Sequence, residues 1–597
     1  MSNALEAASL IMVPSGYEDG TLASVKPNDG TGDFTFSRGS NLSATRINEQ
    51  GYIEKGYENL LLQSNTFDTT WTQVSLLPPT SGQAGYDGTN DAWYFEKVGA
   101  FGRLQQSIST SGVQTLSVYL KAKDSSWVSL QAGGANTSRQ YFDLTAPIET
   151  AKGSSNNIIS SSIEDAGDGW RKCSITYEGT KTFAYVYIAE GNGQVNGTSG
   201  SLYIQDAMLN QGLVAYPYIE TTAAPVSGGI LEDMPRLDWA SGVPSLLLEP
   251  SRTNIMPYSE YFDGFSFNTE DTTLVANSEI GPEGLQNAYK ITADAVFNYH
   301  RIRQILISTS IGSSYTISIF AKSNGHNFIL FRFSQISASN KNVSFNISTG
   351  EVDFQSSVFN NAAVEDYGNG WYRCWATFIS DDPTMEWNLR SQPTTQIGTD
   401  DGIDRYTGDS ESGAYIYGAQ FEEGSYPTSY IPTYGVSQTR LQYSAFASNV
   451  ASLIDSTQGT IFFEGKSLSS VLPNYNYFIS LSDSTSANRM EIRQITDEVQ
   501  FLWRVNNSYQ SQIITIGITI TDFWKVALKY SSTEIKMFFN GSLVDTISSP
   551  TLYSANTLNR VGFDDGYNNF KSNNKVKQVL VFPTALSDEE CIQLTTV

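Results

Sequence analysis

The sequence predicts an all-β protein in which three antiparallel β-sandwiches follow one another along the chain. Only 16% of the 597 residues are charged and 12% are aromatic, a composition typical of β-sheets rather than helices. Segments of about six to nine residues alternate apolar and polar side chains between clusters of Gly, Asn, Asp and Ser. This pattern favours antiparallel sandwiches, and the length fits roughly three to five domains.

An internal repeat indicates that two of the sandwiches are related. The block TLSVY from Thr115 matches TISIF from Thr316, and IEDAGDGWRKCSITY from Ile163 matches VEDYGNGWYRCWATF from Val364. Both pairs of blocks lie 201 residues apart. Because two separate blocks keep one spacing, we expect the same strands at the same places in both units.

A third block shows where the second unit is longer. LYI from Leu202 matches AYI from Ala414, at a separation of 212 residues. The polar, Gly- and Asp-rich segment that starts at Thr394 precedes the second copy, so we expect an inserted surface loop there. Trp170 and Trp371 are expected on equivalent strands. A substantial helical domain before the last unit would contradict the prediction.

The segment PRLDWASGVPSLLLEPSRTNIMPYSEYF, residues 235–262, is predicted to open the second unit. A weaker copy opens the first. Four identities share a separation of 195 residues: Asn59, Ser64, Phe67 and Asp68 match Asn254, Ser259, Phe262 and Asp263. The first copy has no PRLDW-type lead-in before Asn59, so the duplication is expected to have split that lead-in.

Residues 1–56 have a sequence pattern that differs from that of the repeats. Phe34 and Phe36 alternate with Thr35 and Ser37, which predicts a short strand. A segment of this size is too small for an independent core. We therefore expect it to pack on a partner or on the first sandwich, and it is the candidate for an attachment segment.

The last unit is predicted to consist of strands followed by one short helix. The strands are expected near residues 459–464, 477–481, 489–493, 499–505, 523–530, 534–539 and 576–582. Asn540-Gly541 predicts a hairpin, because both residues of that turn need positive φ. Ser587 and Glu590 form a capping box, which predicts a helix after the last strand.

Two resemblances accompany these patterns. The order FWKVALKYSSTEIKMFFNGSLVDT, VGF and KQVLVFPTALSDEE resembles the closing strands and terminal helical turn of the laminin-G or concanavalin A-like sandwich. Other segments resemble tailed-bacteriophage virion proteins, such as tail or head fibres: SLIMVPSGYEDG, GDFTFSRGSNLSATRINEQGYIE, MPRLDW…PSLLLEPSRTNIM and GNGWYRC. In those proteins carbohydrate-binding-like sandwiches follow an N-terminal virion segment, and the resemblance implies the same arrangement here.

The predicted organisation combines the repeat with these resemblances. Its units are 1–56, an N-terminal virion-attachment segment; 57–225, β-sandwich repeat 1; 226–244, a linker; 245–440, β-sandwich repeat 2; and 441–597, a laminin-G or concanavalin A-like sandwich. The predicted fold class is therefore all-β, with three tandem antiparallel sandwiches of jelly-roll or concanavalin A-like type.

The charge balance argues against several partners. The chain has 36 basic and 61 acidic residues and a net charge of −25, which disfavours nucleic acid and anionic membranes. No run of about 18 apolar residues predicts a membrane-spanning helix, and the N-terminus lacks the basic and apolar regions of a secretory signal. Three cysteines do not make a disulfide framework. We therefore expect folding and assembly in a host cytoplasm.

The histidines and cysteines predict no reactive centre. His300 and His326 are the only histidines, and no cysteine stands at metal-binding spacing from either. We therefore expect neither a zinc site nor a histidine-based catalytic relay. Cys173 and Cys374 occupy equivalent positions in the repeat and are predicted to be buried free thiols.

One loop leaves two interpretations open. Residues 165–169, DAGDG, fit a calcium loop, because carboxylates flank glycines on a tight turn. The repeat copy at residues 366–370, DYGNG, has one carboxylate fewer, which favours a β-turn whose glycines supply positive φ. No cofactor is expected, with Ca²⁺ as the alternative. Trp170 and Trp371 follow the two turns and are expected to be core residues rather than sugar platforms.

We expect no enzymatic activity. Glycoside hydrolysis needs two carboxylates at a fixed separation. The partial match to a concanavalin A-like glycosidase strand, Glu351-Val352-Asp353, lacks the second glutamate and lies outside the last unit. Glycan binding needs exposed aromatic faces, and 33 Tyr and 10 Trp supply candidates. Because alternating aromatics are mostly core residues, the sequence assigns no catalytic, cofactor, metal or ligand-binding residue.

The hypothesis from the sequence is a structural virion protein of a tailed phage: a fibre, a decoration protein or another appendage. We expect it on the virion surface, bound to other virion proteins through its N-terminal segment and in contact with host-surface polysaccharide. A homo-oligomer is expected, because sandwiches expose strand edges and repeated proteins are usually symmetric. Two alternatives stay open: a secreted bacterial carbohydrate-binding adhesin, and a capsule depolymerase with glycoside hydrolase activity.

Overall fold

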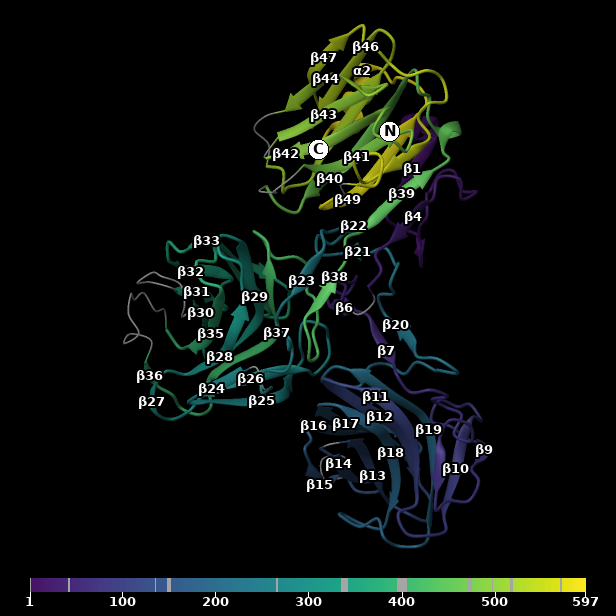
Figure 1. Cartoon of the computed structure of the whole chain (residues 1–597), viewed down its shortest axis with the longest axis vertical. Helices are drawn as coiled ribbons and strands as arrows, with labels where there is room; N and C mark the ends of the chain where they lie inside the picture. Colours follow the sequence, from purple (N-terminus) through teal and green to yellow (C-terminus); the bar gives the residue numbers. More distant parts are fainter. Residues whose placement is uncertain are drawn as a thin grey trace.

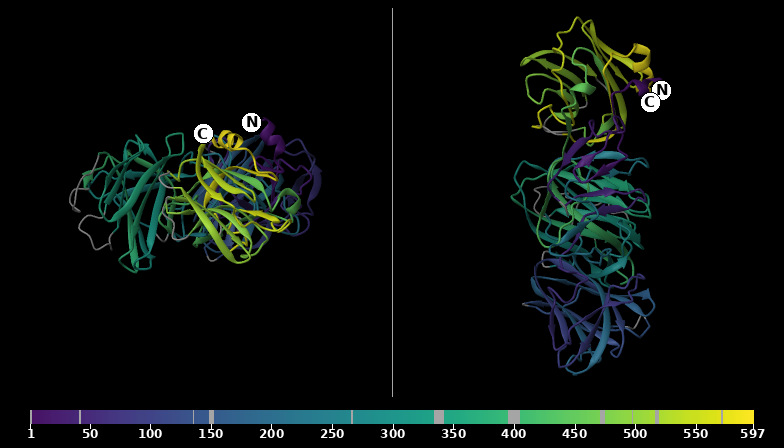
Figure 2. Two further views of the ribbon diagram at one scale, coloured as in Figure 1. Left: turned by 90° about the horizontal axis from the view of Figure 1, so that it is seen from above. Right: turned by 90° about the vertical axis from the view of Figure 1, so that its right-hand side faces the viewer.

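The computed structural model describes residues 2–40, 43–134, 136–147, 152–264, 267–333, 342–394, 405–470, 475–496, 498–515, 519–569 and 572–597. Antiparallel sheets form three lobes around a central set of short strands (Figure 1). The first sandwich is the lower lobe, the second the left lobe and the third the upper lobe, which carries both chain ends (Figure 2). No helix in these ranges is long and apolar enough to cross a membrane.

The first sandwich packs two six-stranded sheets face to face. The β12 sheet has the order β16-β17-β12-β19-β10-β9, and the β18 sheet has the order β15-β14-β13-β18-β11-β8. The bounds are β8 (Thr72–Val74), β9 (Thr80–Gln83), β10 (Ala92–Lys97), β11 (Arg103–Thr110), β12 (Val113–Ala122), β13 (Trp127–Gly134), β14 (Ser138–Asp143), β15 (Lys152–Asn156), β16 (Ser160–Gly167), β17 (Trp170–Glu178), β18 (Lys181–Ala189) and β19 (Gly200–Gln211). Inward-facing residues of both sheets, such as Leu116 and Val186, form its core.

The second sandwich repeats this architecture strand for strand. Its β29 sheet has the order β33-β34-β29-β37-β26-β25, and its β35 sheet has the order β32-β31-β30-β35-β28-β24. The bounds are β24 (Phe267–Glu270), β25 (Thr272–Glu279), β26 (Ala288–Ala293), β28 (Arg301–Ser308), β29 (Ser314–Asn324), β30 (Phe328–Phe333), β31 (Asn342–Asn346), β32 (Glu351–Gln355), β33 (Phe359–Asp366), β34 (Tyr372–Ile379), β35 (Thr384–Gln392) and β37 (Gly413–Glu423), with a small pair, β27 (Phe297–Asn298) and β36 (Tyr406–Thr407). The predicted duplication is confirmed. Residues 395–404 of the expected inserted loop lie outside the described residues.

The opening segments of the two repeats make the same hydrogen bonds. In each, a buried asparagine donates through Nδ2 to two carbonyl oxygens and accepts through Oδ1 from two amides, at 2.8–3.2 Å. The partners are Leu61, Ala207, Leu209 and Ile219 for Asn59, and Met256, Ala419, Phe421 and Ile431 for Asn254. Ser64 and Ser259 each contact a tyrosine hydroxyl, at 2.7 and 2.6 Å. The identities in the sequence therefore mark one structural anchor, used twice.

The third sandwich contains every strand predicted for it and further strands from elsewhere in the chain. Its two sheets have the orders β21-β22-β49-β40-β45-β46-β47 and β2-β3-β4-β39-β48-β41-β42-β43-β44, and β1 also pairs with β49. The bounds of its C-terminal strands are β39 (Ser444–Ser448), β40 (Gly459–Ser467), β41 (Asn476–Ser482), β42 (Arg489–Ile495), β43 (Glu498–Val505), β44 (Ser508–Thr515), β45 (Trp524–Tyr530), β46 (Glu534–Phe539), β47 (Ser542–Ser548), β48 (Arg560–Gly562) and β49 (Asn574–Phe582), with the short helix η2 (Ala451–Leu453). The Asn540-Gly541 turn has φ of 44° and 80°, and Ser587 with Glu590 caps α2 (Asp588–Thr595) as predicted.

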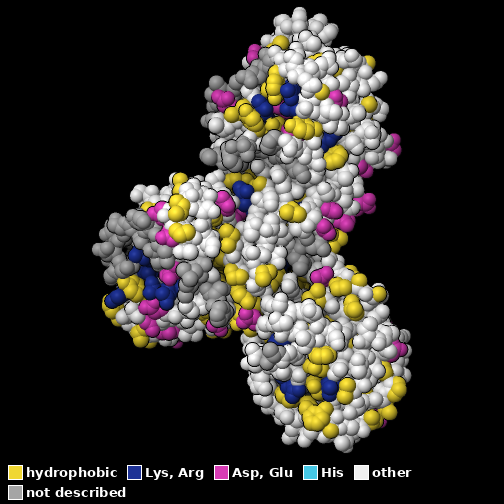
Figure 3. All heavy atoms as spheres, in the orientation of Figure 1, with side chains coloured by type: hydrophobic (Ala, Val, Ile, Leu, Met, Phe, Trp, Pro, Cys, Tyr) yellow, Lys and Arg dark blue, Asp and Glu magenta, His cyan; other side chains and the backbone are white. Residues whose placement is uncertain are grey.

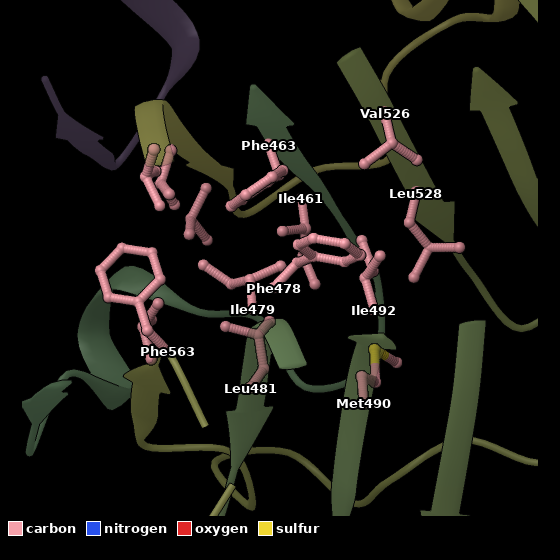
Figure 4. Close-up of a cluster of buried hydrophobic side chains, with 14 of the residues drawn as sticks. Ile461, Phe463, Phe478, Ile479, Leu481, Met490, Ile492, Val526, Leu528 and Phe563 are labelled. Carbon is pink, nitrogen blue, oxygen red and sulfur yellow. The ribbon is translucent and has the colours of Figure 1, made fainter. Parts of the chain in front are cut away.

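The N-terminal segment is built into this third sandwich, which corrects the expectation that it packs on a partner or on the first sandwich. It begins with helix α1 (Ser2–Ala7). Four strands follow: β1 (Leu10–Met12), β2 (Tyr17–Glu18), β3 (Thr21–Leu22) and β4 (Phe34–Ser37). Phe36 pairs with Ala445, and the Phe34 ring stacks on Phe563 at 5.3 Å. Figure 4 shows Phe563 and Phe478 in the same apolar core. The N-terminal segment therefore has no core of its own, and its apolar side chains form part of the core of the third sandwich.

Two lead-in hairpins connect the lobes, which also changes the expected boundaries. Before the first sandwich, β5 (Thr45–Ile47) pairs with β6 (Ile53–Lys55); before the second, β21 (Leu237–Asp238) pairs with β22 (Ser245–Leu248). The first copy therefore has a lead-in after all. Part of the predicted linker and the first residues of predicted repeat 2 belong to the third sandwich, because β22 pairs with β49. Two short pairs complete the centre: β7 (Tyr57–Asn59) with β20 (Val226–Gly228), and β23 (Arg252–Asn254) with β38 (Gln438–Arg440).

A buried ionic cluster joins the first lead-in hairpin to both repeats. Lys55 Nζ lies 2.7 Å from Glu260 and 3.0 Å from Glu283, and the three side chains are at most 2% exposed. Burial acts to lower the pKa of Lys55, but the two carboxylates raise it well above its ordinary range. The same ammonium lies 5.3 Å from the centroid of the Tyr216 ring of the first sandwich.

A second buried cluster joins residues 235–262 to β38, just before the third sandwich. Glu249 lies between two guanidinium groups, 2.5 Å from Arg236 and 3.0 Å from Arg440. Burial would raise the pKa of Glu249, but the two arginines hold it well below its ordinary range. Because removing one member leaves an unmatched buried charge, these clusters fix the lobes relative to the central strands.

Candidate functional site

The outer face of the β18 sheet carries a row of aromatic rings. In β18, the alternation of the strand directs Ala184, Val186 and Ile188 into the core. Phe183, Tyr185 and Tyr187 therefore lie on the opposite face, away from the core. At about 3.3 Å per residue, the row extends over about 13 Å.

The rings of this row contact one another. Phe183 stacks on Tyr185 with ring centroids 5.6 Å apart and planes at 22°, and Tyr185 lies 5.7 Å from Tyr187. Gly133 of the neighbouring strand makes room, because a Cβ added there would lie 2.5 Å from the Tyr185 ring. A larger residue at this position would therefore lift the ring off the sheet.

Cations and amides surround the rings. The Arg103 guanidinium lies 5.6 Å from the centroid of the Tyr185 ring and 5.4 Å from that of Tyr187. Arg139 lies 4.9 Å from Tyr187. Gln105 and Gln131 are the direct cross-strand neighbours of Tyr185, and Arg103 donates to Gln105 at 3.0 Å. We call this set, Phe183, Tyr185, Tyr187, Arg103, Arg139, Gln105 and Gln131, the Tyr185 face.

One end of the Tyr185 face is covered and the other is partly exposed. Val195, in the loop after β18, packs against Tyr187 and Tyr141. Phe183 and Tyr185 are half-buried. Burial raises the pKa of Tyr185, and Tyr187 raises it further, so its phenol stays neutral at physiological pH. Figure 3 shows hydrophobic and basic side chains side by side on the lower lobe.

The chemistry of the Tyr185 face suits binding rather than bond cleavage. Aromatic faces pack against apolar faces of a ligand ring, and the arginine and glutamine side chains donate hydrogen bonds to oxygen atoms. Asp143 is the only acidic residue in the six strands of this sheet. Glycoside hydrolysis requires a pair of carboxyl groups across the bond, which these strands do not supply.

The equivalent face of the second sandwich has different side chains. The inward ladder Leu104–Val186–Leu130 corresponds to Ile302–Leu389–Phe331. This register equates each residue of the row with one on β35: Phe183 with Glu386, Tyr185 with Asn388 and Tyr187 with Arg390. The repeat therefore keeps the sheet and replaces the aromatic row with charged and amide side chains. Figure 3 shows basic and acidic side chains gathered on the left lobe.

The residues that the sequence singled out are structural. Trp170 and Trp371 are 1% and 2% exposed and stand at equivalent positions, at the start of β17 and just before β34. Cys173 and Cys374 are buried free thiols facing equivalent partners. Both loops form the tight turns predicted by the β-turn interpretation, since Asp168 has a φ of 49° and its counterpart Asn369 has 53°. The predicted burial of the tryptophans and cysteines is confirmed, and both turns are present.

The remaining candidates do not converge on a centre. His300 and His326 are buried against Tyr406, at ring distances of 4.5 and 5.5 Å. Glu351 and Asp353 lie on β32, at the edge of the β35 sheet. Across the described ranges, no group of three or more His, Cys, Asp or Glu side chains is arranged to hold a metal ion.

Sequence reasoning did not identify the Tyr185 face. The signal was present as FAYVY, residues 183–187, in which aromatic and small apolar residues alternate. Both sets are apolar, so periodicity alone does not say which set faces outward. The sheet register and the opposing β12 sheet decide it.

No protein-family model matches the chain, and comparison with curated proteins finds no match. Among solved structures, the chain is similar to the Ruminococcus gnavus IT-sialidase CBM40 bound to α2,3-sialyllactose, with 19% identity, 25% of this chain, 86% of that chain and a TM-score of 0.22. It is also similar to a leech intramolecular trans-sialidase, with 23% identity, a TM-score of 0.20 and coverage of 24% of each chain.

A third similar structure is the CBM22-1–CBM22-2 tandem domain of Paenibacillus barcinonensis Xyn10C. It has 10% identity and a TM-score of 0.19, covering 65% of this chain and 100% of that one. The chain covers 24% of the leech enzyme's own length. Similarities at these scores assign no function to the chain.

Proposed function

We propose that the protein is a non-enzymatic appendage of a tailed-phage virion that binds host-surface polysaccharide through the Tyr185 face. The observation that carries the glycan-binding part is the stacked pair Phe183–Tyr185 beside Arg103 and two glutamines. Aromatic rings with adjacent hydrogen-bond donors are the features that recognise sugars. The virion part is supported by the resemblance of segments such as SLIMVPSGYEDG to virion proteins.

Binding to immobilised host polysaccharide tests the glycan-binding part. Tyr185→Ala removes the ring and is expected to weaken binding at least tenfold, which is about 1.4 kcal/mol. Tyr185→Phe keeps the ring and is expected to bind within about threefold of the wild type, since it loses only the hydroxyl. Tyr509→Ala is the matched control, because Tyr509 is 54% exposed and also lies beside an arginine, at 4.3 Å. Equal binding by the Tyr185→Ala and wild-type proteins would refute the assignment of this face.

The non-enzymatic part has a separate test. The purified protein is incubated with host capsular polysaccharide, and the chain length of the polysaccharide is followed by size-exclusion chromatography. We expect no shortening, because the Tyr185 face carries no pair of carboxylates across a cleft. Shortened chains would instead support the depolymerase alternative.

The virion part is tested by mass spectrometry of purified particles. We expect the chain among the particle proteins, on the virion surface and at a copy number that reflects a symmetric homo-oligomer. Its strands β1 to β4 are part of the third sandwich, so the attachment surface is proposed on that lobe. Presence of the protein only in the culture medium, behind a cleaved leader, would favour the adhesin alternative.

A further inference from the structure

A cleft of about 530 Å³ lies where the second and third sandwiches meet the lead-in hairpins. Its lining comes from three parts of the chain: Asp238 and Trp239 from residues 235–262, Glu365 and Arg373 from the second sandwich, and Lys466 and Lys575 from the third. Ligand sites commonly have volumes of roughly 300–1,000 Å³ and lie between domains. The cleft therefore has the size and position of a binding site.

Trp239, the last residue of the PRLDW motif, offers an aromatic face to this cleft. The preceding residues of the motif have structural partners: Arg236 binds Glu249, and Asp238 lies 2.5 Å from Lys575. Trp239 is half-buried, and its indole N–H has no hydrogen-bond partner among the described residues. Trp239 also lines a second hollow of about 460 Å³ beside Tyr17, so a ligand chain can extend past it.

The third sandwich supplies two lysines to the cleft, one of which has no close ion pair. Lys466 and Lys575 are cross-strand neighbours on β40 and β49. Asp238 pairs with Lys575, whereas no carboxylate in the described part of the chain lies within 4.0 Å of the Lys466 ammonium. Burial lowers the pKa of Lys466 and the neighbouring Lys575 lowers it further, whereas Asp522, Asp238 and Glu365 act in the opposite direction. An anion in hydrogen-bond contact with Lys466 would lie closer to the ammonium than these carboxylates do.

The part of the cleft lining that comes from the second sandwich adds a buried hydrogen-bond donor, Arg373. Arg373 is 2% exposed and donates to Ser318 at 3.0 Å. Its Nε has no hydrogen-bond acceptor among the described residues. A buried N–H without an acceptor is unusual and costly, and a polar ligand or water in the cleft would satisfy it.

We propose that this cleft is a second glycan site, selective for a sugar unit that carries a carboxylate, such as a hexuronic or sialic acid. Trp239 packs against the sugar ring and Lys466 binds the carboxylate. The aromatic contact suits any pyranose, whereas the charge-assisted hydrogen bond selects the acidic one. This site shares no residue with the Tyr185 face, so either site can fail without the other.

Titration calorimetry on the full chain tests the proposal with three probes: methyl β-D-glucuronide, the methyl glycoside of N-acetylneuraminic acid, and the neutral methyl β-D-glucoside. We expect at least one acidic probe to bind at least tenfold more tightly than the glucoside. Lys466→Gln is expected to abolish this preference, and Trp239→Ala to weaken binding of the acidic probe at least tenfold.

Two matched variants separate this site from general effects. Lys466 and Lys577 both lie over the Phe523 ring, at 5.3 and 3.9 Å, but only Lys466 lines the cleft. Lys577→Gln should therefore leave binding of the acidic probe unchanged, and Tyr185→Ala shows whether the Tyr185 face contributes to that binding. The proposal is overturned if neither acidic probe binds, if the glucoside binds equally well, or if Lys577→Gln has the same effect as Lys466→Gln. If the Tyr185→Ala protein no longer bound the acidic probe, the binding site for that probe would be the Tyr185 face and not the cleft.

Discussion

The first and second sandwiches have the same strand orders and the same asparagine anchor, yet their outer faces differ. Tyr185 and Tyr187 of the first correspond to Asn388 and Arg390 of the second. The anchor side chains bind main-chain groups, which are the same in every sequence, whereas outer-face side chains contact other side chains, such as Asn388 with Arg301 and Arg390 with Tyr299. Duplication therefore preserves the scaffold, while the outer face of the sheet differs between the repeats.

A second difference lies at a β-bulge in the strand that closes each repeat. Both repeats have a register shift here, on β19 and β37. The left-handed position is Asp206 in the first sandwich, with a φ of 51°, and Gly418 in the second, with a φ of 63°. A Cβ at Gly418 would lie 2.9 Å from the Phe320 ring, so packing requires glycine there. The first sandwich instead holds a carboxylate, 2.9 Å from the Tyr86 hydroxyl.

The largest expected effect tests whether the scaffold is shared. Asn59→Ala and Asn254→Ala each remove the four hydrogen bonds of an anchor, and each leaves buried amides without acceptors. We expect each change to destabilise its own sandwich by about 3 kcal/mol, measured by hydrogen exchange resolved along the chain. Asn268→Ala, on an exposed position of β24, is the control. A cost below about 1 kcal/mol in either repeat would show that the anchors are not equivalent.

The next effect concerns the contact between the repeats. Gly112 and Gly312 have φ of 82° and 85°, but a Cβ at Gly112 would lie 1.7 Å from the Tyr434 carbonyl oxygen, and one at Gly312 would meet nothing within 4 Å. Gly112→Ala is expected to separate the first sandwich from the second and to cost about 2 kcal/mol. Small-angle scattering detects the change in shape. Gly312→Ala, which bears the same backbone strain, should keep the wild-type profile.

A smaller effect appears in the pH dependence of the first sandwich. Burial raises the pKa of Asp206 to about 7, helped by Asp91 and Asp87. Its unfolded value is about 4. The folded state therefore binds the proton more tightly, and this stabilisation is complete below about pH 4 and lost as pH rises through about 7.

Asp206→Asn removes that titration and keeps a side chain that tolerates positive φ. We expect a decline in the Tm of the first sandwich between pH 4 and 8 in the wild type and a flatter profile in the variant, measured by calorimetry. The second sandwich has Gly418 at this position and serves as the internal control. An unchanged slope in Asp206→Asn would contradict the assignment.

The smallest effect compares equivalent arginines. Arg103 lies over two tyrosine rings of the Tyr185 face, whereas its counterpart Arg301 pairs with Glu270 at 2.6 Å. Arg103→Gln is expected to weaken polysaccharide binding about threefold, in line with a cation–π contact of about 0.5–1 kcal/mol. Arg301→Gln should leave binding unchanged. Equal losses would place the glycan on both faces and remove the distinction between the repeats.

Local patterns predicted much of the fold. The repeated blocks fixed the equivalence of the two sandwiches, because alternation and turn residues act within a few positions. The Asn540-Gly541 turn and the Ser587–Glu590 capping box depend on neighbours within three residues, and both are present. The packing position of residues 1–56 was not predictable in this way. Phe36 pairs with Ala445, and the residues near Phe36 in the sequence do not indicate that partner.

The sequence by itself determined that the protein is all-β, that two units are duplicates and where most strands lie. These properties follow from side-chain periodicity and from turns that need particular backbone angles. The tertiary structure decided which strands complete the third sandwich, how Lys55 and Glu249 hold the lobes together, and that Tyr185 faces outward while Trp170 is buried. Burial depends on what packs against a residue, and in this chain that partner is often hundreds of residues away.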